Sequence, residues 1–260
     1  MDLQIKGKWA LVCGASRGLG LGCAEALVRE GVHVLIVARR EAVLSEAAQA
    51  LRALGSAQVL ACAADITTEA GRAQVFALRK EFDIVVTNAG GPPSGNFRDW
   101  GREDWIRAVE ANMLTPIELI KATVDGMAAR GFGRIINITS GAVKSPIEAL
   151  GLSNGARSGL TGFVAGLARS GIAAQGVTVN NLLPGAFDTD RLQSLFATTA
   201  GKTSQTVDAV AAQRRKSIPA QRFGQPQEFG AACAFLCSPL AGYITGQNIL
   251  VDGGAFGGTF

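Results

Sequence analysis

Short apolar runs alternate along the chain with longer segments in which apolar residues recur every three or four positions. The run Val34-Leu35-Ile36-Val37 is continuous, which is typical of a strand buried on both faces of a sheet. The pattern predicts strands over residues 9–13, 32–38, 58–61, 84–87, 134–138, 178–183 and 248–251. Between them it predicts helices over residues 19–30, 41–54, 68–80, 105–129, 155–174 and 226–237.

Regular alternation of strand and helix predicts a parallel sheet with helices on both faces, because each crossover helix must pack back onto the sheet. We therefore expect a doubly wound, Rossmann-type α/β fold in three α/β/α layers, formed by residues 1–260 as a single domain. The long polar, helix-prone segment 187–224 interrupts this alternation before the last helix. A lid or substrate loop is the interpretation we give it.

Composition excludes several classes of protein. Hydrophobic residues make up 48% and charged residues 18% of the 260, which argues against disorder. The net charge is only +4, and the longest basic cluster is Arg214-Arg215-Lys216, so a nucleic-acid-binding surface is not expected. No apolar run is long enough for a membrane helix and no signal peptide opens the chain, so we expect a cytoplasmic protein.

The metal-binding side chains are too few and badly spaced for a metal site. The chain has one histidine and five cysteines, with no Cys-x-x-Cys pair. We expect the cysteines to be small buried side chains in a reducing compartment, and no metal.

A glycine-rich turn joins the first predicted strand to the first predicted helix, in the sequence Gly14-Ala15-Ser16-Arg17-Gly18-Leu19-Gly20. Such a turn lets the backbone approach a pyrophosphate and aims the free N–H groups of the helix at it. A side chain at Gly14 or Gly20 would obstruct the turn or its packing. We therefore expect a dinucleotide site formed by Gly14, Ser16, Arg17, Gly18, Leu19 and Gly20.

The end of the second predicted strand indicates which dinucleotide binds. An acidic residue there would accept hydrogen bonds from the ribose hydroxyls, but this chain has Arg39 and Arg40, followed only then by Glu41. Guanidinium groups suit bidentate pairing with a 2′-phosphate, and Arg17 adds another cation near the same place. The sequence predicts NADP(H) as cofactor.

Further short motifs follow the later predicted strands: Asp65-Ile66, Asn88-Ala89-Gly90, Val179-Asn180, Pro184-Gly185 with Thr189, and the segments 243–247 and 251–254. Together with the Gly-x-x-x-Gly-x-Gly turn, this set resembles the short-chain dehydrogenase/reductase family over nearly the whole chain, and most closely its β-ketoacyl-ACP reductase branch. The resemblance implies adenine contacts at Asp65 and Ile66, a motif beside the cofactor at Asn88, Ala89 and Gly90, and nicotinamide contacts near Pro184, Gly185 and Thr189.

The resemblance also identifies the expected catalytic positions. The family uses an asparagine, a serine, a tyrosine and a lysine four residues after the tyrosine. Asn112 and Ser140 match the first two, whereas the tyrosine position falls on Ser153 and the lysine position on Arg157. The only tyrosine in the chain, Tyr243, lies in the C-terminal motif and does not replace the missing one.

These replacements change the expected chemistry. A serine hydroxyl sits further from a bound carbonyl and is a far weaker acid than a phenol, whose reference pKa is about 10. Arg157 stays protonated and does not relay protons, but it can still donate hydrogen bonds to the nicotinamide ribose.

Three functions therefore stay open. The first is an NADP(H)-dependent oxidoreductase that reduces a 3-oxoacyl-like carbonyl, with Ser140, Arg157 or water stabilising the oxyanion. The second is a non-catalytic NADP-binding protein that serves as a sensor or an assembly subunit. The third is a different reaction in which Lys144 acts as a base. The expected partner is a small-molecule substrate, and the resemblance implies a homo-oligomer, a tetramer or a dimer, with contacts through the helices that bear Asn112 and Arg157.

Overall fold

The core of the molecule is a parallel sheet of seven strands. A computed structural model describes residues 1–259 and gives the strand order β3-β2-β1-β4-β5-β6-β7, with every neighbouring pair parallel. The strands are β1 (Trp9–Cys13), β2 (His33–Ala38), β3 (Val59–Ala63), β4 (Ile84–Thr87), β5 (Gly133–Ile138), β6 (Val177–Pro184) and β7 (Asn248–Val251). The order reverses between β1 and β4, which places a crevice at their carboxyl ends, where doubly wound folds bind ligands.

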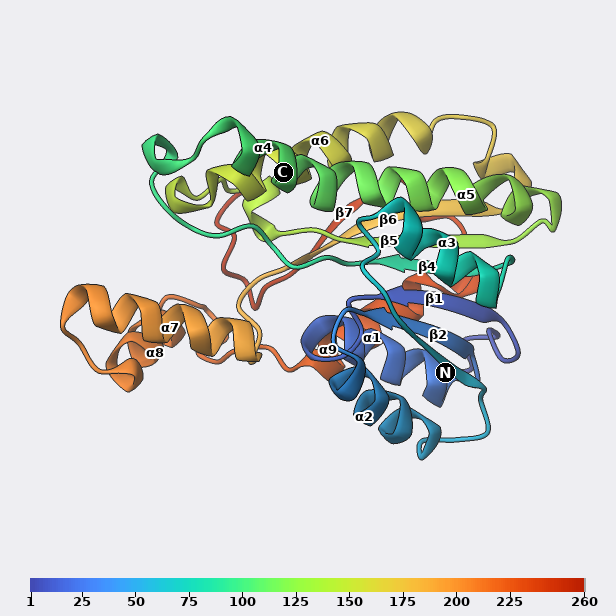
Figure 1. The fold of residues 1–260 in the computed structure, drawn as a ribbon, viewed down its shortest axis with the longest axis horizontal. Helices are drawn as coiled ribbons and strands as arrows, with labels where there is room; N and C mark the ends of the chain where they lie inside the picture. Colours follow the sequence, from blue (N-terminus) through green and yellow to red (C-terminus); the bar gives the residue numbers. More distant parts are fainter. Residues whose placement is uncertain (260) are drawn as a thin grey trace.

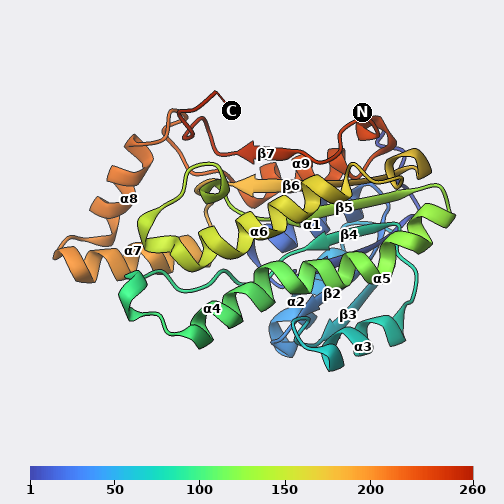
Figure 2. The ribbon, with the colours of Figure 1, turned by 90° about the horizontal axis from the view of Figure 1, so that it is seen from above.

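Helices cover both faces of this sheet, as Figures 1 and 2 show. One face carries α1 (Gly18–Arg29), α2 (Glu41–Arg52) and α9 (Pro226–Leu236), and the other carries α3 (Glu69–Leu78), α4 (Arg102–Val109), α5 (Thr115–Ala129) and α6 (Gly151–Leu167). Each face has its own apolar core, because successive strand residues point to opposite sides of the sheet. The predicted Rossmann-type, three-layer fold is confirmed.

Side chains of successive strand residues divide between the two cores. Val12, Val34 and Ile36 pack under α1 and α2, whereas Leu11 and Leu35 pack under α5 on the opposite face. All five are fully buried. This explains why the central strands are continuously apolar: a sheet covered on both faces has no side for polar residues.

Two predicted helices differ from the observed ones. The predicted helix over residues 105–129 begins earlier and is divided into α4 and α5 by a π-helical turn, η2 (Glu110–Leu114). A π-turn inserts one extra residue into the helical ladder, and apolar periodicity alone does not reveal it. The helix predicted from residue 155 begins instead at Gly151 and ends at Leu167, so Ser153 lies within its first turn.

The segment 187–224 contains α7 (Asp190–Thr203) and α8 (Val207–Lys216), which lie beyond the carboxyl ends of the strands (Figure 2). The two helices enclose a small core of their own, which includes Phe196, Val210 and Phe223. An isolated parallel bridge from Phe187 to Gly224 joins the two ends of the segment where it leaves and rejoins the sheet domain. The segment is therefore an ordered excursion rather than an open loop.

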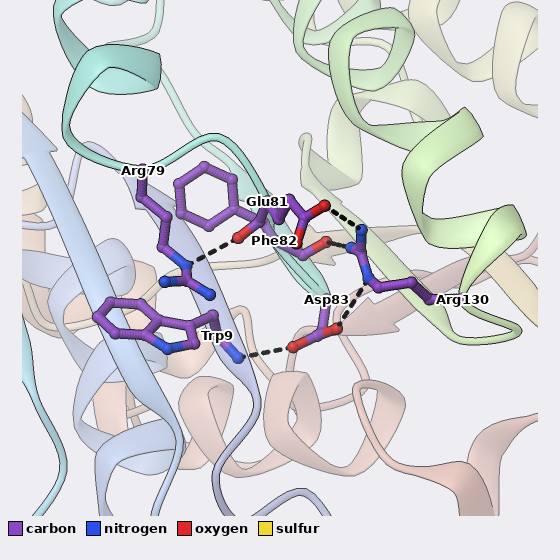
Figure 3. Close-up of polar contacts among 6 residues, drawn as sticks. All are labelled: Trp9, Arg79, Glu81, Phe82, Asp83 and Arg130. Atoms are coloured by element: carbon purple, nitrogen blue, oxygen red, sulfur yellow. Dashed lines mark hydrogen bonds and ion pairs between the residues drawn. The ribbon is translucent and has the colours of Figure 1, made fainter.

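Where β1 and β4 begin, a polar network connects the sheet to the end of α5 (Figure 3). Asp83 accepts a hydrogen bond from the backbone N–H of Trp9 at 2.9 Å and lies 3.6 Å from Nε of Arg130. Arg130 also donates to the carbonyl of Phe82 at 2.7 Å, and the Arg79 guanidinium lies 4.0 Å from the ring centroid of Trp9. These contacts join β1, β4 and the end of α5.

No helix within residues 1–259 combines the length and the apolar character that crossing a membrane requires. All five cysteines are buried and have free thiols. The described residues contain no cluster of histidine, cysteine and acidic side chains that could hold a metal ion.

Candidate active site

The glycine-rich turn between β1 and α1 has the close backbone approach that the sequence predicted. Gly14 and Gly18 both have a φ of 59°, which favours glycine. A Cβ at Gly14 would lie 2.7 Å from the side-chain nitrogen of Asn88, and a Cβ at Gly20 would overlap the carbonyl of Gly14. The prediction that side chains at Gly14 and Gly20 would obstruct this turn is confirmed.

The amino terminus of α1 leaves its first N–H groups free for a ligand. Its N-cap residue, Arg17, makes no side-chain capping hydrogen bond, and no acidic residue occupies the first turn. The backbone N–H groups of Gly18, Leu19 and Gly20 have no acceptor within the described residues, and Ser16 is partly buried beside them. Uncapped N–H groups at the positive end of a helix fit a pyrophosphate. The turn therefore fits a dinucleotide.

The three arginines expected near the 2′-phosphate, Arg17, Arg39 and Arg40, differ in their ion pairing. Arg39 and Arg40 follow β2, are exposed, and belong to none of the ion pairs among residues 1–259. Arg17 instead forms an ion pair with Asp190 at the start of α7, at 2.6 Å. Arg39 and Arg40 are thus available to an anion, whereas Arg17 connects the phosphate turn to the 187–224 segment.

The other residues predicted to contact the cofactor line the same edge of the sheet. Asn88, after β4, donates from Nδ2 to the carbonyl of Gly14 at 3.3 Å, with the partly buried Ala89 and the exposed Gly90 following it. Asp65, after β3, accepts hydrogen bonds from the backbone N–H and the hydroxyl of Thr67, at 3.0 and 2.8 Å. Its neighbour Ile66 is buried in the core.

The end of β6 brings the α7 segment to the phosphate turn. The methyl group of Thr189 lies 3.4 Å from the position a Cβ would take at Gly18. Thr189 also caps α7, because its hydroxyl accepts from the backbone N–H of Leu192 at 3.4 Å. Pro184 and Gly185 precede it, and Gly185 is packed against Asp252, which a Cβ would meet at 2.6 Å.

Asn112 lies in the π-helical turn between α4 and α5 and is 3% exposed. Its side-chain nitrogen donates to the carbonyl of Ala108 at 3.2 Å, but its side-chain oxygen has no hydrogen-bond partner within residues 1–259. A buried amide oxygen without a donor is costly unless a further group or a water satisfies it. π-turns are frequent at functional sites because they re-aim side chains of this kind.

Ser140 and Ser153 lie on separate elements near the carboxyl end of β5. Ser140 lies two residues after the end of β5, and its hydroxyl accepts from the backbone N–H of Ala142 at 3.1 Å. Ser153 lies in the first turn of α6 and is buried. Lys144, the alternative base, has its amino group 5.7 Å from the ring centroid of Phe256 and makes no hydrogen bond to Ser140.

Arg157 lies one helical turn after Ser153 and is 7% exposed. Its Nη1 donates to the carbonyl of Ile138, the last residue of β5, at 2.6 Å. Burial lowers the pKa of the guanidinium to about 10, and the positive charge of Arg191 lowers it as well. Arg157 is still protonated at neutral pH, so a buried positive charge lies beside the strand end.

Arg191 was not predicted. It lies in the first turn of α7 and donates from Nη1 to the carbonyl of Gly91 at 3.1 Å and from Nη2 to that of Pro92 at 3.3 Å. Its guanidinium packs directly on Gly91, where a Cβ would come within 2.5 Å of Nη2. Thr189, two residues earlier, and the segment 187–224 were the sequence signals near it, and neither indicated which side chain would pack on Gly91.

Comparisons with known proteins agree with this architecture. Residues 14–255 match the family model described as Enoyl-(Acyl carrier protein) reductase. The 3-oxoacyl-[acyl-carrier-protein] reductase FabG of Vibrio cholerae is 35% identical over 259 residues, covering 98% of this chain and 99% of that protein.

Two solved structures show the same similarity in three dimensions. L-sorbose reductase from Gluconobacter frateurii, complexed with NADPH and L-sorbose, superimposes with a TM-score of 0.92 at 30% identity, over 99% of this chain and 100% of that one. A 7α-hydroxysteroid dehydrogenase complexed with NADH and 7-oxo glycochenodeoxycholic acid gives a TM-score of 0.86 at 30% identity, over 97% of this chain and 96% of that one.

A glycine-rich turn with free N–H groups at the start of a doubly wound sheet, with polar side chains near the carboxyl ends of its strands, is typical of dinucleotide-binding proteins. The family match and the identities above show that this chain belongs to the short-chain dehydrogenase/reductase family.

Proposed function

We propose that this chain is an NADP(H)-dependent oxidoreductase that reduces a carbonyl group at an atypical active site. The observation that carries the proposal is Arg157, a buried guanidinium with free N–H groups at the carboxyl end of β5. Hydride transfer to a carbonyl places negative charge on its oxygen, and a fixed donor in a poorly solvated site stabilises that charge. Ser140 and Arg157 are the groups that would donate to the oxygen.

The dinucleotide would be held by the turn from Gly14 to Gly20, with Arg39 and Arg40 at the 2′-phosphate. When bound, it supplies the hydride. Asp65, Asn88 and Thr189 surround the same crevice. The preference for NADP(H) is supported by the two unpaired arginines and by the NADPH in the L-sorbose reductase complex, although the 7α-hydroxysteroid dehydrogenase complex contains NADH.

Ser153 and Arg157 take the positions at which the family resemblance places tyrosine and lysine. Tyr243, the only tyrosine of the chain, is fully exposed near the start of β7. The site therefore offers no phenol to protonate the alkoxide, and a water molecule supplies that proton. Asn112, with its unpartnered oxygen, is the buried side chain suited to hold such a water on the α4–α5 side.

The named relatives support a substrate class, and the surface of the molecule supports an assembly state. The similarity to a 3-oxoacyl-[acyl-carrier-protein] reductase supports a 3-oxoacyl-like carbonyl substrate. Exposed apolar side chains on α4 and η2, Trp105, Ile106 and Leu114, support a homo-oligomer with contacts near Asn112. The free, buried cysteines support a cytoplasmic location, and 187–224 would serve as the lid.

A second candidate function is that of a non-catalytic NADP-binding protein, a sensor or an assembly subunit. The absence of a phenol from the site favours it, because the groups that grip the cofactor do not depend on the missing proton donor. In that case NADPH would bind tightly and no carbonyl compound would be reduced.

The test is NADPH oxidation against a panel of β-keto esters, diketones and quinones, beside a direct titration of NADPH binding. The double variant Ser153→Tyr, Arg157→Lys is the control that restores the family pattern. We expect turnover by the natural chain. Tight NADPH binding with turnover by the double variant alone would favour the non-catalytic protein, and absence of NADPH binding would overturn both candidates.

A further inference from the structure

Two arginine side chains among the described residues are buried, and their surroundings differ. Arg134, at the amino end of β5, is 4% exposed and donates to the carbonyls of Gly133, Gly176 and Ser238 at 2.7, 2.8 and 3.1 Å. Arg157, at the carboxyl end of the same strand, donates only to the carbonyl of Ile138. Most of the five N–H groups of Arg157 are therefore unused within residues 1–259.

Arg191 brings a second cation to the same place. Its guanidinium donates to the carbonyls of Gly91 and Pro92, on the loop that continues from β4, and β4 pairs with β5, at whose end Arg157 donates to Ile138. The positive charge of Arg191 also lowers the pKa of Arg157. Arg157 and Arg191 come from α6 and from the lid helix α7, so they approach from different elements. Partial burial of the Arg191 guanidinium lowers its pKa too.

Neither arginine has an acidic partner. The ion pairs of the described residues engage Arg17, Arg107, Arg130 and Arg222, and none of them includes Arg157 or Arg191. Two like charges, one of them buried, destabilise each other, and a buried charge without a counter-ion is costly. An anion bound between them would relieve both costs.

We propose that Arg157 and Arg191 together bind the carboxylate of the substrate, so that the site takes small oxo acids rather than neutral ketones. A carboxylate presents two oxygens in one plane, which matches the fork of a guanidinium. The free N–H groups of Arg157 are numerous enough to reach a carboxylate oxygen and the neighbouring ketone oxygen of one short molecule. Arg191 closes the site from the lid.

The arrangement also distinguishes this anion site from the one for the cofactor. The pyrophosphate is accounted for by the N–H groups at the start of α1, and the 2′-phosphate by Arg39 and Arg40. The nicotinamide ribose offers only neutral hydroxyl groups to Arg157, so it does not neutralise the charge there. A second anion would neutralise the buried charge of Arg157, with the exposed Arg191 as its other partner. The inference rests on the proposed function, of which it names the substrate class.

Binding of malonate and of dimethyl malonate, compared by calorimetry, is the direct test. The two probes have the same skeleton and differ in charge, and neither needs to react. We expect malonate to bind at least about 10-fold more tightly than its ester, the factor that one charge-assisted hydrogen bond supplies. Arg191→Gln should reduce this preference to less than about 3-fold. Arg214→Gln, on the neighbouring helix α8, is the matched control and should leave the preference unchanged.

Equal binding of acid and ester by the natural chain would overturn the inference, and so would an acid preference that survives Arg191→Gln. Acetoacetate and methyl acetoacetate, assayed as substrates with NADPH, extend the comparison to turnover. If both are reduced equally well, the proposed reduction stands and the carboxylate site does not. If malonate is preferred but NADPH does not bind, the carboxylate site stands and the proposed function fails.

Discussion

At the amino-terminal edge of the sheet Arg130 is surrounded by Asp83, Glu81 and the carbonyl of Phe82 (Figure 3), whereas at the carboxyl-terminal edge Arg157 has a single carbonyl. Arg134 repeats the first pattern at the amino end of β5, with three carbonyls around its guanidinium. Buried or half-buried arginines are thus surrounded by acceptors where the strands begin, whereas Arg157 has few acceptors where β5 ends.

The difference separates the polar groups that stabilise the fold from those that are available to bind a ligand. At the amino edge the polar groups satisfy one another, so the contacts stabilise the fold and offer little to a ligand. Toward the carboxyl ends of the strands, α1 begins with free N–H groups, Asn112 has an unpartnered amide oxygen and Arg157 donates to one carbonyl only. Local costs of this kind are tolerated where a ligand will satisfy them.

The largest effect is expected at the phosphate turn. Gly20→Ala places a methyl group against the carbonyl of Gly14, so the turn must shift and its N–H groups no longer point at the pyrophosphate. We expect NADPH affinity to fall by at least about 100-fold, measured by fluorescence titration. Gly162→Ala, on α6 with nothing within 4 Å, is the control and should bind NADPH normally. A Gly20→Ala protein that is folded by circular dichroism and keeps its affinity would refute the role of this close approach.

The two buried arginines provide the sharpest test of the comparison. Arg134→Met removes three hydrogen bonds to carbonyls, of which that of Gly176 keeps the N–H of Gly133 as a donor, and we expect the free energy of unfolding to fall by about 3 kcal/mol. Arg157→Met removes a poorly compensated buried charge and leaves one carbonyl, so its stability should stay within about 1 kcal/mol of the natural chain. Urea unfolding measures both. Equal losses would show that the two edges do not differ in this way.

A smaller loss is expected from the network in Figure 3. Asp83→Asn removes the charge that faces Arg130 and weakens the acceptor for the N–H of Trp9. We expect a loss of about 1 to 2 kcal/mol in the free energy of unfolding, with unchanged NADPH affinity. Glu81→Gln, whose 71% exposed side chain lies 3.7 Å from the same arginine, should change stability by less than about 0.5 kcal/mol. A change in NADPH affinity caused by Asp83→Asn would contradict the expectation that this network contributes to stability and not to cofactor binding.

The smallest effect concerns a surface pair and depends on pH. Hydrogen bonds from Arg222 and from the backbone of Gln225 lower the pKa of Glu228 to about 2, below its usual 4.5. Because the folded-state pKa is depressed, the stabilisation is present above pH 4.5 and is lost as pH falls towards 2. Thermal unfolding should show Glu228→Gln less stable than the natural chain at pH 7, with the gap closing in acid. A gap that persists at pH 2 would exclude this origin.

Most of the fold could be predicted because its signals are local. β1, β4 and β7 begin and end where the apolar runs do, and the glycine turn stands directly between a strand and a helix. The predicted helix from 105 to 129 was wrong in its start and in its continuity, since apolar periodicity does not reveal the π-turn at η2.

The candidate site could be predicted only in part, for a related reason. Gly14 and Ser140 follow identifiable strand ends, and Arg157 lies on the helix after the second of these strands, so their neighbourhood could be inferred from the order of elements. Arg191 could not, because its position depends on how α7 is oriented over the loop at Gly91. The lack of an acidic side chain paired with Arg157 also could not be predicted, because it depends on which residues the folded chain brings together. The roles of the predicted site residues stay predictions.

Adjacent residues at the start of α7 reach in different directions: Asp190 holds Arg17 on the phosphate turn, and Arg191 holds the carbonyls of Gly91 and Pro92. The first tether is an exposed ion pair, which dissolved salt screens, whereas the second runs to uncharged carbonyls and is less sensitive to screening. Ionic strength therefore acts on one side of this helix more than on the other. The position of α7 over the crevice, and any affinity that depends on it, is set partly by the salt in which the protein is studied.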